Sequence, residues 1–314
     1  MGHLEIATNL STRRRKALLA VAGDLVFLDV PRDAPWEVPD GARITIQQAS
    51  GWPRAPRDCP AGWPGALEWL HFVSAGVDAY PSWALMVPTV TCGRHVNSVP
   101  IAEYAMAAIM AVEKPIGASA LKSPDRQARM ALGMLEGKTL GLFGFGAIGN
   151  EIATRARAFG MKVIVARRRE GSASQSGVRL VAGPAELMSC SDHLVICAPL
   201  TAQTRGIFDA GLFAHAKPGL HLVNIARGGL IDEAALLAAL DDGRVSRATL
   251  DVLQQEPPAP DDPLVAHPNT LVTPHISWQG GDTDARIAAR IAANLARWRN
   301  GEPLADVVDV AAGY

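Results

Sequence analysis

The sequence predicts an α/β protein of two domains, each built on a doubly wound parallel sheet. Three observations carry this prediction. The chain has 314 residues, which suits two domains at ~100–200 residues each. From residue 139 onward, apolar strand-like runs alternate with helical segments, as a parallel sheet requires. A glycine-rich loop stands between the first of these runs and the helix that follows it.

Composition excludes several other classes. Lys and Arg total 30 and Asp and Glu total 31, so the chain lacks the basic excess of a nucleic-acid-binding protein. The longest apolar stretch, residues 102–112, contains Glu103 and is too short to span ~30 Å of hydrocarbon. The N-terminus has no signal-peptide pattern. The four scattered cysteines fit reduced thiols, so we expect a cytoplasmic protein with no nucleic-acid partner, no membrane partner and no metal site.

The first hundred residues contain short apolar runs separated by Pro and Gly, which predict strands. These runs are residues 4–8, 25–30, 43–47, 69–73 and 86–90. Ser11 or Thr12 is expected to cap a helix that begins near Arg13. A buried helix over residues 101–112 would carry the chain into the second domain, and residues 114–129 would form a surface connection.

The second domain is predicted to hold six parallel strands, over residues 139–143, 162–166, 193–197, 221–226, 247–252 and 270–273. Helices are expected between them, over residues 147–159, 184–189, 209–214 and 232–241. An amphipathic helix over residues 283–298 follows the last strand, which suggests a return to the first domain. We therefore expect one domain of residues 1–100 plus 281–314 and another of residues 101–280.

Residues 144–149 form a GxGxxG motif directly after a strand and at the start of a helix, as dinucleotide binding requires. Gly144 permits the tight turn, Gly146 lets the backbone approach a pyrophosphate, and Gly149 allows close packing of helix and strand. The helix N-terminus, with the N–H groups of Ala147 and Ile148, would face the phosphates. The alternative is a purely structural glycine turn.

An NAD site places an acidic residue ~20 residues after the loop, where it binds the ribose 2′-hydroxyl. Here that position is occupied by Arg167 and Arg168, with no acid nearby. A carboxylate would repel a 2′-phosphate, whereas a guanidinium binds it through two parallel hydrogen bonds. We therefore expect a preference for NADP(H). The alternative is that these arginines lie on a solvated turn and NAD(H) is still accepted.

Polar residues follow three neighbouring strands of the predicted sheet, at the edge where a doubly wound fold binds its ligand. His275 can exchange a proton near neutral pH. Glu256, bonded to the other ring nitrogen, would orient the imidazole and favour its protonated form. Arg227 can hold a substrate carboxylate and polarise the adjacent carbonyl. Beside a nicotinamide, the three residues predict hydride transfer to a 2-keto acid.

The sequence resembles the D-isomer-specific 2-hydroxyacid dehydrogenase family, in particular its glyoxylate/hydroxypyruvate reductase branch. The resemblance is carried by "GLFGFGAIG" (141–149), "CAPLTAQTRGIF" (197–208), "KPGLHLVNIARGGLIDEAALLAAL" (217–240), "LDVLQQEPP" (250–258) and "HPNTLVTPHISW" (267–278). It is weaker at "SAGVD" (74–78) and "NSVPIAEYAMAAIM" (97–110). In this family the fold is two Rossmann-like domains, the first flavodoxin-like, with the active site in the cleft between them.

The resemblance also implies roles for individual residues. His275, Glu256 and Arg227 would be the acid–base residue, its partner and the substrate anchor. The expected cofactor contacts are Ile148 and the glycines at the pyrophosphate, Pro199 and Thr204 beside the ribose, Asp251 at the nicotinamide carboxamide, and Ile225 with Ala226. The expected substrate contacts are the backbone of Ala75, Gly76 and Val77, with Trp278 as a pocket wall or a packing residue and Trp52 on a loop facing the substrate.

The function expected from these observations is NADPH-dependent reduction of a small 2-keto acid to the D-2-hydroxy acid. One alternative is an NAD-linked D-2-hydroxyacid dehydrogenase acting on another substrate. A second, of a different class, is a dinucleotide-sensing binding protein similar to the corepressors of this family. The usual assembly of the family is a homodimer through the cofactor domain.

Overall fold

The computed structural model describes residues 3–119, 131–167 and 177–313. The chain divides into two compact units, the first formed by Met1–Asn97 with Gly280–Tyr314 and the second by Ser98–Gln279. The boundaries expected from the sequence, 100/101 and 280/281, differ from these by three residues and by one residue. Both units are α/β structures with wholly parallel sheets, as the sequence predicts.

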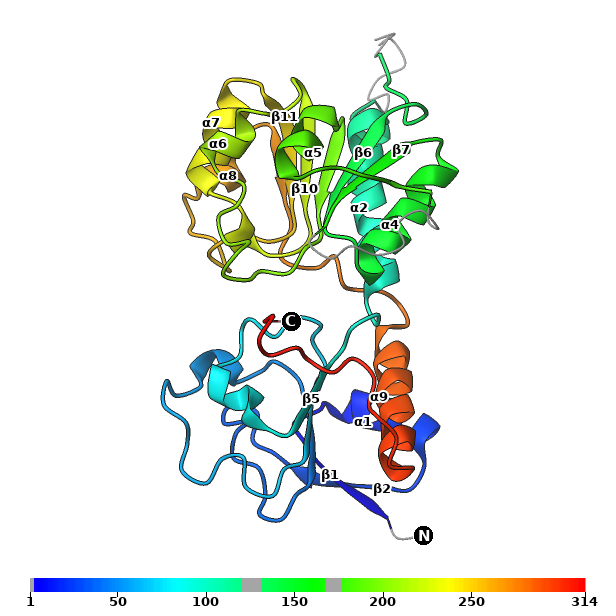
Figure 1. The fold of residues 1–314 in the computed structure, drawn as a ribbon, viewed down its shortest axis with the longest axis vertical. Helices are drawn as coiled ribbons and strands as arrows, with labels where there is room; N and C mark the ends of the chain where they lie inside the picture. The colour runs from blue at the N-terminus through cyan, green and yellow to red at the C-terminus, as the bar shows by residue number, and fades with distance from the viewer. Residues whose placement is uncertain (1–2, 120–130, 168–176, 314) are drawn as a thin grey trace. The chain divides into compact units, whose positions relative to one another are not determined.

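The first unit contains a five-stranded sheet in the order β2-β1-β3-β4-β5 (Figure 1). Its strands are β1 (Leu4–Thr8), β2 (Leu25–Asp29), β3 (Ile44–Gln47), β4 (Trp69–Phe72) and β5 (Thr89–Cys92). This is the flavodoxin-like order, with its reversal at β1 and β3. Helices α1 (Thr12–Ala22) and α9 (Thr283–Arg299) pack on one face of the sheet, so the return of the chain completes this core. Ser11 is the N-cap of α1, as expected.

An aromatic cluster covers the other face of this sheet and overturns the expectation for Trp52. The Trp52 indole is 2% exposed, donates its N–H to Gln47 Oε1 at 3.1 Å and packs edge-on against Phe72 and Tyr80. A buried indole whose only donor is satisfied is a core residue. The predicted strand 86–90 is shifted in the structure, because Ser82–Met86 form the short 3-10 helix η2 and the strand begins after Pro88. A second 3-10 helix, η1, is Trp52–Arg54.

The second unit contains a seven-stranded sheet in the order β12-β11-β10-β9-β6-β7-β8 (Figure 1). Its strands are β6 (Thr139–Phe143), β7 (Lys162–Ala166), β8 (Arg179–Leu180), β9 (His193–Ile196), β10 (Leu220–Asn224), β11 (Val245–Leu250) and β12 (Thr270–Val272). Six of them match the predicted strands. The seventh, β8, is a two-residue edge strand with both residues exposed, so it has no apolar run to reveal it.

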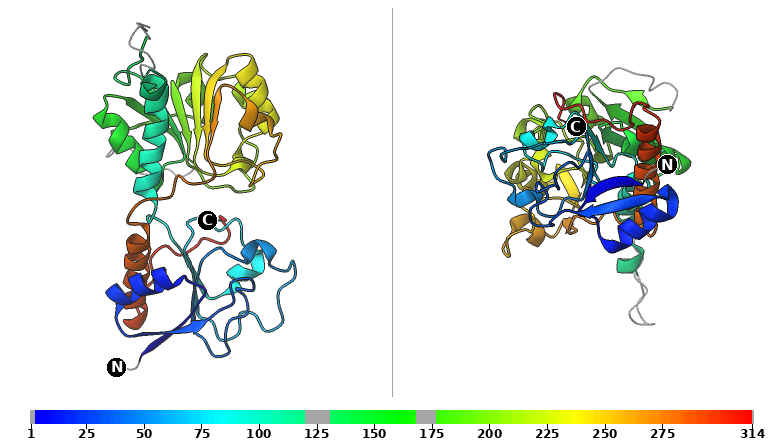
Figure 2. Two further views of the ribbon diagram at one scale, coloured as in Figure 1. Left: turned by 180° about the vertical axis from the view of Figure 1, so that it is seen from behind. Right: turned by 90° about the horizontal axis from the view of Figure 1, so that it is seen from below.

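Helices cover both faces of this sheet, as the opposite views in Figure 1 and in the left panel of Figure 2 show. Helices α2 (Ser98–Glu113) and α4 (Ala147–Ala158) share one core with the sheet. The opposite face is covered by α5 (Pro184–Cys190), α6 (Ala210–Phe213), α7 (Glu233–Asp241) and α8 (Pro263–Ala266). A short helix, α3 (Ile116–Ser119), follows α2. None of the described helices combines the length and the apolar character needed to cross a bilayer.

Candidate functional site

The glycine loop lies between β6 and α4, at the point where the strand order of the second unit reverses. Gly144 has φ +100°, and a Cβ there would come within 2.7 Å of the Ala198 backbone nitrogen, so only glycine fits. Gly146, in contrast, has nothing within 4 Å of a built Cβ, and no described side chain caps α4. The loop therefore leaves open backbone and the first N–H groups of a twelve-residue helix, which fits a pyrophosphate.

Arg167 follows β7, next to this loop. Its guanidinium carbon lies 6.0 Å from the centre of the Phe145 ring, the second residue of the GxGxxG motif. The main chain also joins the two segments, because Gly144 N donates to Ala166 O at 2.9 Å. The arginine at the position expected for the ribose therefore lies beside the phosphate loop. Arg168 lies outside the described residues.

The loop after β9 borders the glycine loop from the other neighbouring strand. Thr204 Oγ1 lies 2.8 Å from Pro199 O and accepts from Thr201 N at 2.8 Å, so this hydroxyl fixes the loop. Cys197 donates its Sγ–H to Gly144 O at 3.1 Å, and burial raises the pKa of this thiol to about 12. The predicted ribose contacts Pro199 and Thr204 thus lie at the same sheet edge as the glycines.

Arg227 is held at the end of β10 by the residues around it. Asn224 uses both ends of its amide, accepting from Ala226 N at 3.1 Å and donating to Arg227 O at 2.9 Å. Gly228 brings this segment against the loop after β11, since a Cβ there would come within 1.9 Å of the Leu253 carbonyl carbon. Ile225 is 6% exposed and belongs to the core. Backbone contacts thus set where the Arg227 side chain emerges.

His275 and Glu256 are in direct contact at this edge. His275 Nδ1 lies 2.7 Å from Glu256 Oε2, and the other carboxylate oxygen accepts from Leu253 N at 3.2 Å. A carboxylate can only accept, so Nδ1 carries the proton of this pair. Proton exchange with a substrate can then proceed only through Nε2. Both side chains are about two-fifths exposed, so the pair is accessible from solvent.

The turn that carries His275 is held by Asp251 and Trp278. His275 has φ +52°, a conformation that costs a non-glycine residue ~1–3 kcal/mol. Its N–H donates to Asp251 O at 3.0 Å, and the Asp251 carboxylate accepts from Ile276 N at 2.8 Å and Ser277 N at 2.9 Å. Trp278 donates its indole N–H to His275 O at 2.8 Å. Asp251 and Trp278 thus support the backbone of the histidine.

The predicted substrate backbone lies in the first unit, after β4. Ser74 Oγ donates to Gly76 O at 3.0 Å and lies 2.8 Å from the Tyr80 hydroxyl, which fixes the loop of Ala75 and Gly76. Val77 is 3% exposed and packs in the core. The loop is therefore ordered at a strand end, and its role toward a substrate stays a prediction.

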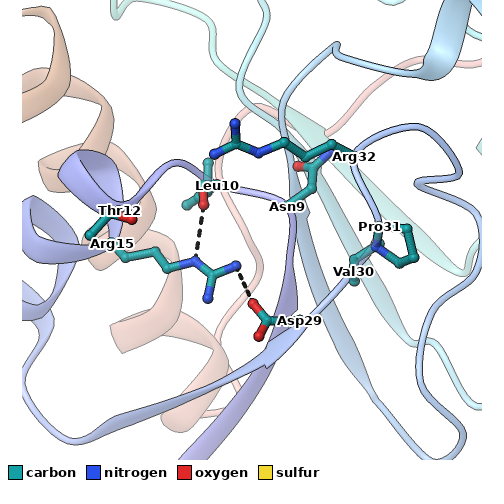
Figure 3. A pocket seen from close by; sticks show the side chains of 8 residues that line it. All are labelled: Asn9, Leu10, Thr12, Arg15, Asp29, Val30, Pro31 and Arg32. Atoms are coloured by element: carbon teal, nitrogen blue, oxygen red, sulfur yellow. Dashed lines mark hydrogen bonds and ion pairs between the residues drawn. The ribbon is translucent and has the colours of Figure 1, made fainter.

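A hollow in the first unit lies at the ends of β1 and β2 (Figure 3). Arg15 lines it, but its guanidinium donates to Leu10 O at 3.0 Å and pairs with Asp29 Oδ1 at 2.7 Å. Protein groups thus engage the Arg15 charge, and Arg32, the other arginine at the hollow, is exposed, so the hollow gives no argument for a ligand.

The order of the seven-stranded sheet, with a glycine loop at its reversal, defines a dinucleotide-binding α/β unit. The family model described as "D-isomer specific 2-hydroxyacid dehydrogenase, NAD binding domain" matches residues 106–277, more than half of the chain. The chain belongs to the D-isomer specific 2-hydroxyacid dehydrogenase family, whose members are NAD(P)-dependent oxidoreductases.

Two curated relatives illustrate the range of the family. The chain is 37% identical over 221 residues to D-3-phosphoglycerate dehydrogenase of Bacillus subtilis, covering 69% of this chain and 42% of that protein. It is 38% identical over 212 residues to 4-methyl-2-oxopentanoate reductase A of Aspergillus oryzae, covering 65% of this chain and 64% of that protein. The chain thus spans about two fifths of the length of the first relative.

Solved structures of the family match the whole chain. A D-isomer specific 2-hydroxyacid dehydrogenase from Xanthobacter autotrophicus, in complex with NADPH and MES, gives a TM-score of 0.83 at 25% identity over 100% of both chains. The NADPH-dependent glyoxylate/hydroxypyruvate reductase of Sinorhizobium meliloti, with NADP and sulfate, gives 0.78 at 25% identity over 100% of both chains.

Proposed function

We propose that this protein reduces a small 2-keto acid, of the glyoxylate or hydroxypyruvate type, to the D-2-hydroxy acid with NADPH. The observation that carries the proposal is the contact of His275 Nδ1 with Glu256 at 2.7 Å, at the same sheet edge as the glycine loop. Family membership supports the reaction class, since its members transfer hydride between a nicotinamide and a 2-hydroxy acid.

The cofactor would be held by the backbone N–H groups of residues 147–149 and by the loop containing Pro199 and Thr204. The Asp251 carboxylate would accept from the nicotinamide carboxamide. When bound, the reduced nicotinamide supplies a hydride to the carbonyl carbon of the substrate. The open backbone at Gly146 suits a pyrophosphate, and the buried Asp251 carboxylate after β11 suits an N–H donor.

The remaining chemistry falls to three side chains. Arg227 binds the substrate carboxylate and draws electron density from the adjacent carbonyl. Protonated His275 would give its Nε2 proton to the carbonyl oxygen; the π bond of the carbonyl is broken, the C–O single bond remains, and one C–H and one O–H bond form. Glu256 holds the imidazole through Nδ1 and stabilises its cationic form before transfer.

NADPH is favoured over NADH because Arg167 lies where a carboxylate would select the 2′-hydroxyl of NAD. The solved relatives from Xanthobacter and Sinorhizobium, described with NADPH and NADP, agree with this choice. Arg168, the second predicted contact, belongs to the same proposal.

The test is a steady-state comparison of NADPH with NADH across glyoxylate, hydroxypyruvate, pyruvate, phenylpyruvate and 3-phosphohydroxypyruvate. The proposal predicts the largest kcat/KM for NADPH with one of the first two acids. An Arg167→Asp variant should then lose most of its NADPH activity while keeping its activity with NADH. Equal or better turnover with NADH would favour the NAD-linked alternative, and dinucleotide binding without turnover of any acid would favour the binding-protein alternative.

We also propose a cytosolic homodimer that associates through the second unit. Ile116, Leu132 and Met134 of this unit are large apolar side chains that are 52% to 75% exposed, and a second copy of the chain would cover them. The four free cysteines suit a reducing compartment. Sedimentation of the wild type and of a Met134→Glu variant tests the assembly, with a monomeric wild type contradicting it.

A further inference from the structure

Tyr104 is a residue of helix α2 whose hydroxyl reaches the turn of His275. Its oxygen lies 2.6 Å from Thr273 Oγ1, and Thr273 Oγ1 lies 2.6 Å from Asp251 Oδ1. The tyrosine and the threonine are 169 positions apart in the sequence. Burial raises the pKa of the Tyr104 phenol, so it keeps its proton and can donate at neutral pH. The Tyr104 hydroxyl, the Thr273 hydroxyl and the Asp251 carboxylate thus form a continuous series of hydrogen bonds from helix α2 to the buried carboxylate.

Which group donates each of these hydrogen bonds follows from the chemistry of the Asp251 carboxylate. An ionised carboxylate only accepts, so Thr273 donates its single hydroxyl proton to Asp251. Thr273 Oγ1 can then only accept from Tyr104, which therefore donates. The proton positions along Tyr104, Thr273 and Asp251 are fixed, and hydrogen bonds that point the same way strengthen one another.

Asp251 connects these hydrogen bonds with the turn of His275. Its carboxylate is 1% exposed and accepts three donors of the described residues, the Thr273 hydroxyl and the N–H groups of Ile276 and Ser277. Two carboxylate oxygens offer about four acceptor positions, so one position is left on Oδ2 for a further donor. The same carboxylate therefore fixes the turn around His275 and presents one remaining acceptor in a set direction.

We infer that Tyr104 is a positioning residue that, through Thr273, sets the orientation of the Asp251 carboxylate and with it the turn of His275. Its consequence for catalysis rests on the proposed function. Its consequence for the turn does not, because the N–H groups of Ile276 and Ser277 report on Asp251 in the protein without substrate or cofactor.

The test compares Tyr104→Phe, Thr273→Val and the double variant with the wild type. Tyr104→Phe should lower kcat about fivefold, the effect of one net hydrogen bond, with little change in the KM of the keto acid. Thr273→Val should lower kcat about tenfold, because it removes a donor from a buried carboxylate. In the double variant the loss should equal that of Thr273→Val alone, because without the threonine hydroxyl Tyr104 has nothing to orient.

Three controls separate positioning from general destabilisation. Thr273→Ser keeps the hydroxyl and should restore wild-type kcat. Thr270→Val removes a hydroxyl from β12, the strand that Thr273 directly follows; this hydroxyl donates to Leu264 O, and its loss should leave kcat unchanged. In the cofactor-free protein, Tyr104→Phe should speed amide hydrogen exchange of Ile276 and Ser277 several-fold, whereas Thr270→Val should not.

The outcomes distinguish the inference from the proposed function. Additive losses in the double variant, or unchanged exchange of Ile276 and Ser277 in Tyr104→Phe, would overturn the positioning role and leave the function standing. A wild type that reduces no 2-keto acid would overturn the proposed function, and the exchange measurement would then decide the role of Tyr104 alone.

Discussion

The two ends of the seven-stranded sheet each hold a cluster of titratable side chains, and only one has the features of an active site. At the carboxyl end, His275 is half-exposed, has a strained backbone and uses only Nδ1 to bind Glu256. At the amino end, His193 and His221 are each 1% exposed and lie side by side at the starts of β9 and β10. The same residue type therefore lies in opposite environments at the two edges.

The amino-end cluster is closed. His193 Nδ1 lies 3.0 Å from His221 Nδ1, His193 Nε2 lies 3.1 Å from Glu113, and His221 Nε2 lies 3.1 Å from Thr249. Lys138 pairs with the same Glu113. Each ring nitrogen is buried within 3.1 Å of a protein atom, although His193 Nε2 makes no hydrogen bond to Glu113, so none of the four is exposed to a substrate. A solvent-exposed ring with one nitrogen held by a carboxylate, as at His275, therefore suits proton transfer better than a cluster of buried ionisable groups does.

The largest expected effect is at the carboxyl end. Replacing His275 by Gln should lower kcat about 1,000-fold, because the proton donor to the carbonyl oxygen is lost. The free energy of unfolding should stay within ~1 kcal/mol of the wild type, since the side chain is half-exposed. Steady-state kinetics and urea unfolding of the same preparation measure both. A variant with wild-type kcat would refute the assignment of His275.

Arg227→Lys should lower kcat/KM about 100-fold, mostly through a higher KM for the keto acid. A lysine keeps the charge but cannot form two parallel hydrogen bonds with a carboxylate. The KM of NADPH serves as the internal control and should change little. Equal losses for both substrates would point to a general disturbance of the strand ends instead.

At the amino end, His221→Leu should lower the free energy of unfolding by about 2 kcal/mol, because His193 Nδ1 and Thr249 lose their buried partner. Activity per folded molecule should be unchanged. Urea unfolding with a parallel rate measurement tests this, and a loss of kcat at full folding would contradict the structural role of the pair.

The pH dependence of stability sharpens the same contrast. Burial lowers the pKa of His221 to about 3 and lowers that of His193 as well, with Glu113, Lys138, Asp192 and Arg247 as the surrounding charges. In the first unit, burial lowers the pKa of His71 to about 3 beside Arg290. The folded state therefore disfavours the protonated rings. Their stabilising contribution is complete above pH ~6.5, the unfolded value, and is lost as the pH falls toward the folded values.

Each of these histidines should contribute a slope of up to ~1.4 kcal/mol per pH unit to the free energy of unfolding between pH ~6 and ~4. Urea unfolding at several pH values measures this slope. His221→Leu should reduce this slope by up to ~1.4 kcal/mol per pH unit, the contribution of one titrating ring. Equal slopes in the wild type and His221→Leu would contradict the burial argument.

The smallest effect is expected for Trp278→Phe, which removes the indole donor to His275 O and keeps an aromatic ring. We expect kcat to fall about fivefold, the effect of one net hydrogen bond. Trp298→Phe is the matched control, since Trp298 stacks on Trp69 in the first unit and should leave kcat unchanged. A large rise in the substrate KM of Trp278→Phe would instead favour the pocket-wall interpretation of Trp278.

Much of the fold could be predicted because parallel strands are buried on both faces and appear as apolar runs. β10 is fully buried along its length, and its run is plain in the sequence. β8 could not be found, because an exposed two-residue edge strand depends on its neighbour β7 for pairing. The shifted start of β5 has a similar origin, since the apolar residues Met86 and Val87 precede a proline.

The site could be predicted only in part. Local motifs marked His275, Glu256 and Arg227, because strand order alone brings their segments to one edge. No spacing rule connects Tyr104 with Thr273, since their contact depends on how helix α2 packs on the sheet. The burial of Trp52 had the same kind of cause, a tertiary partner in Gln47 that the local sequence does not reveal.

The most direct test of the central claim is deuterium transfer from NADPH labelled at C4 of the nicotinamide to a 2-keto acid. The account predicts deuterium at C2 of a D-2-hydroxy acid with the wild type and with His221→Leu, and almost none with His275→Gln. An unlabelled product, or equal transfer by the His275→Gln variant, would contradict the proposal that the carboxyl edge of this sheet performs hydride transfer with His275 as the proton donor.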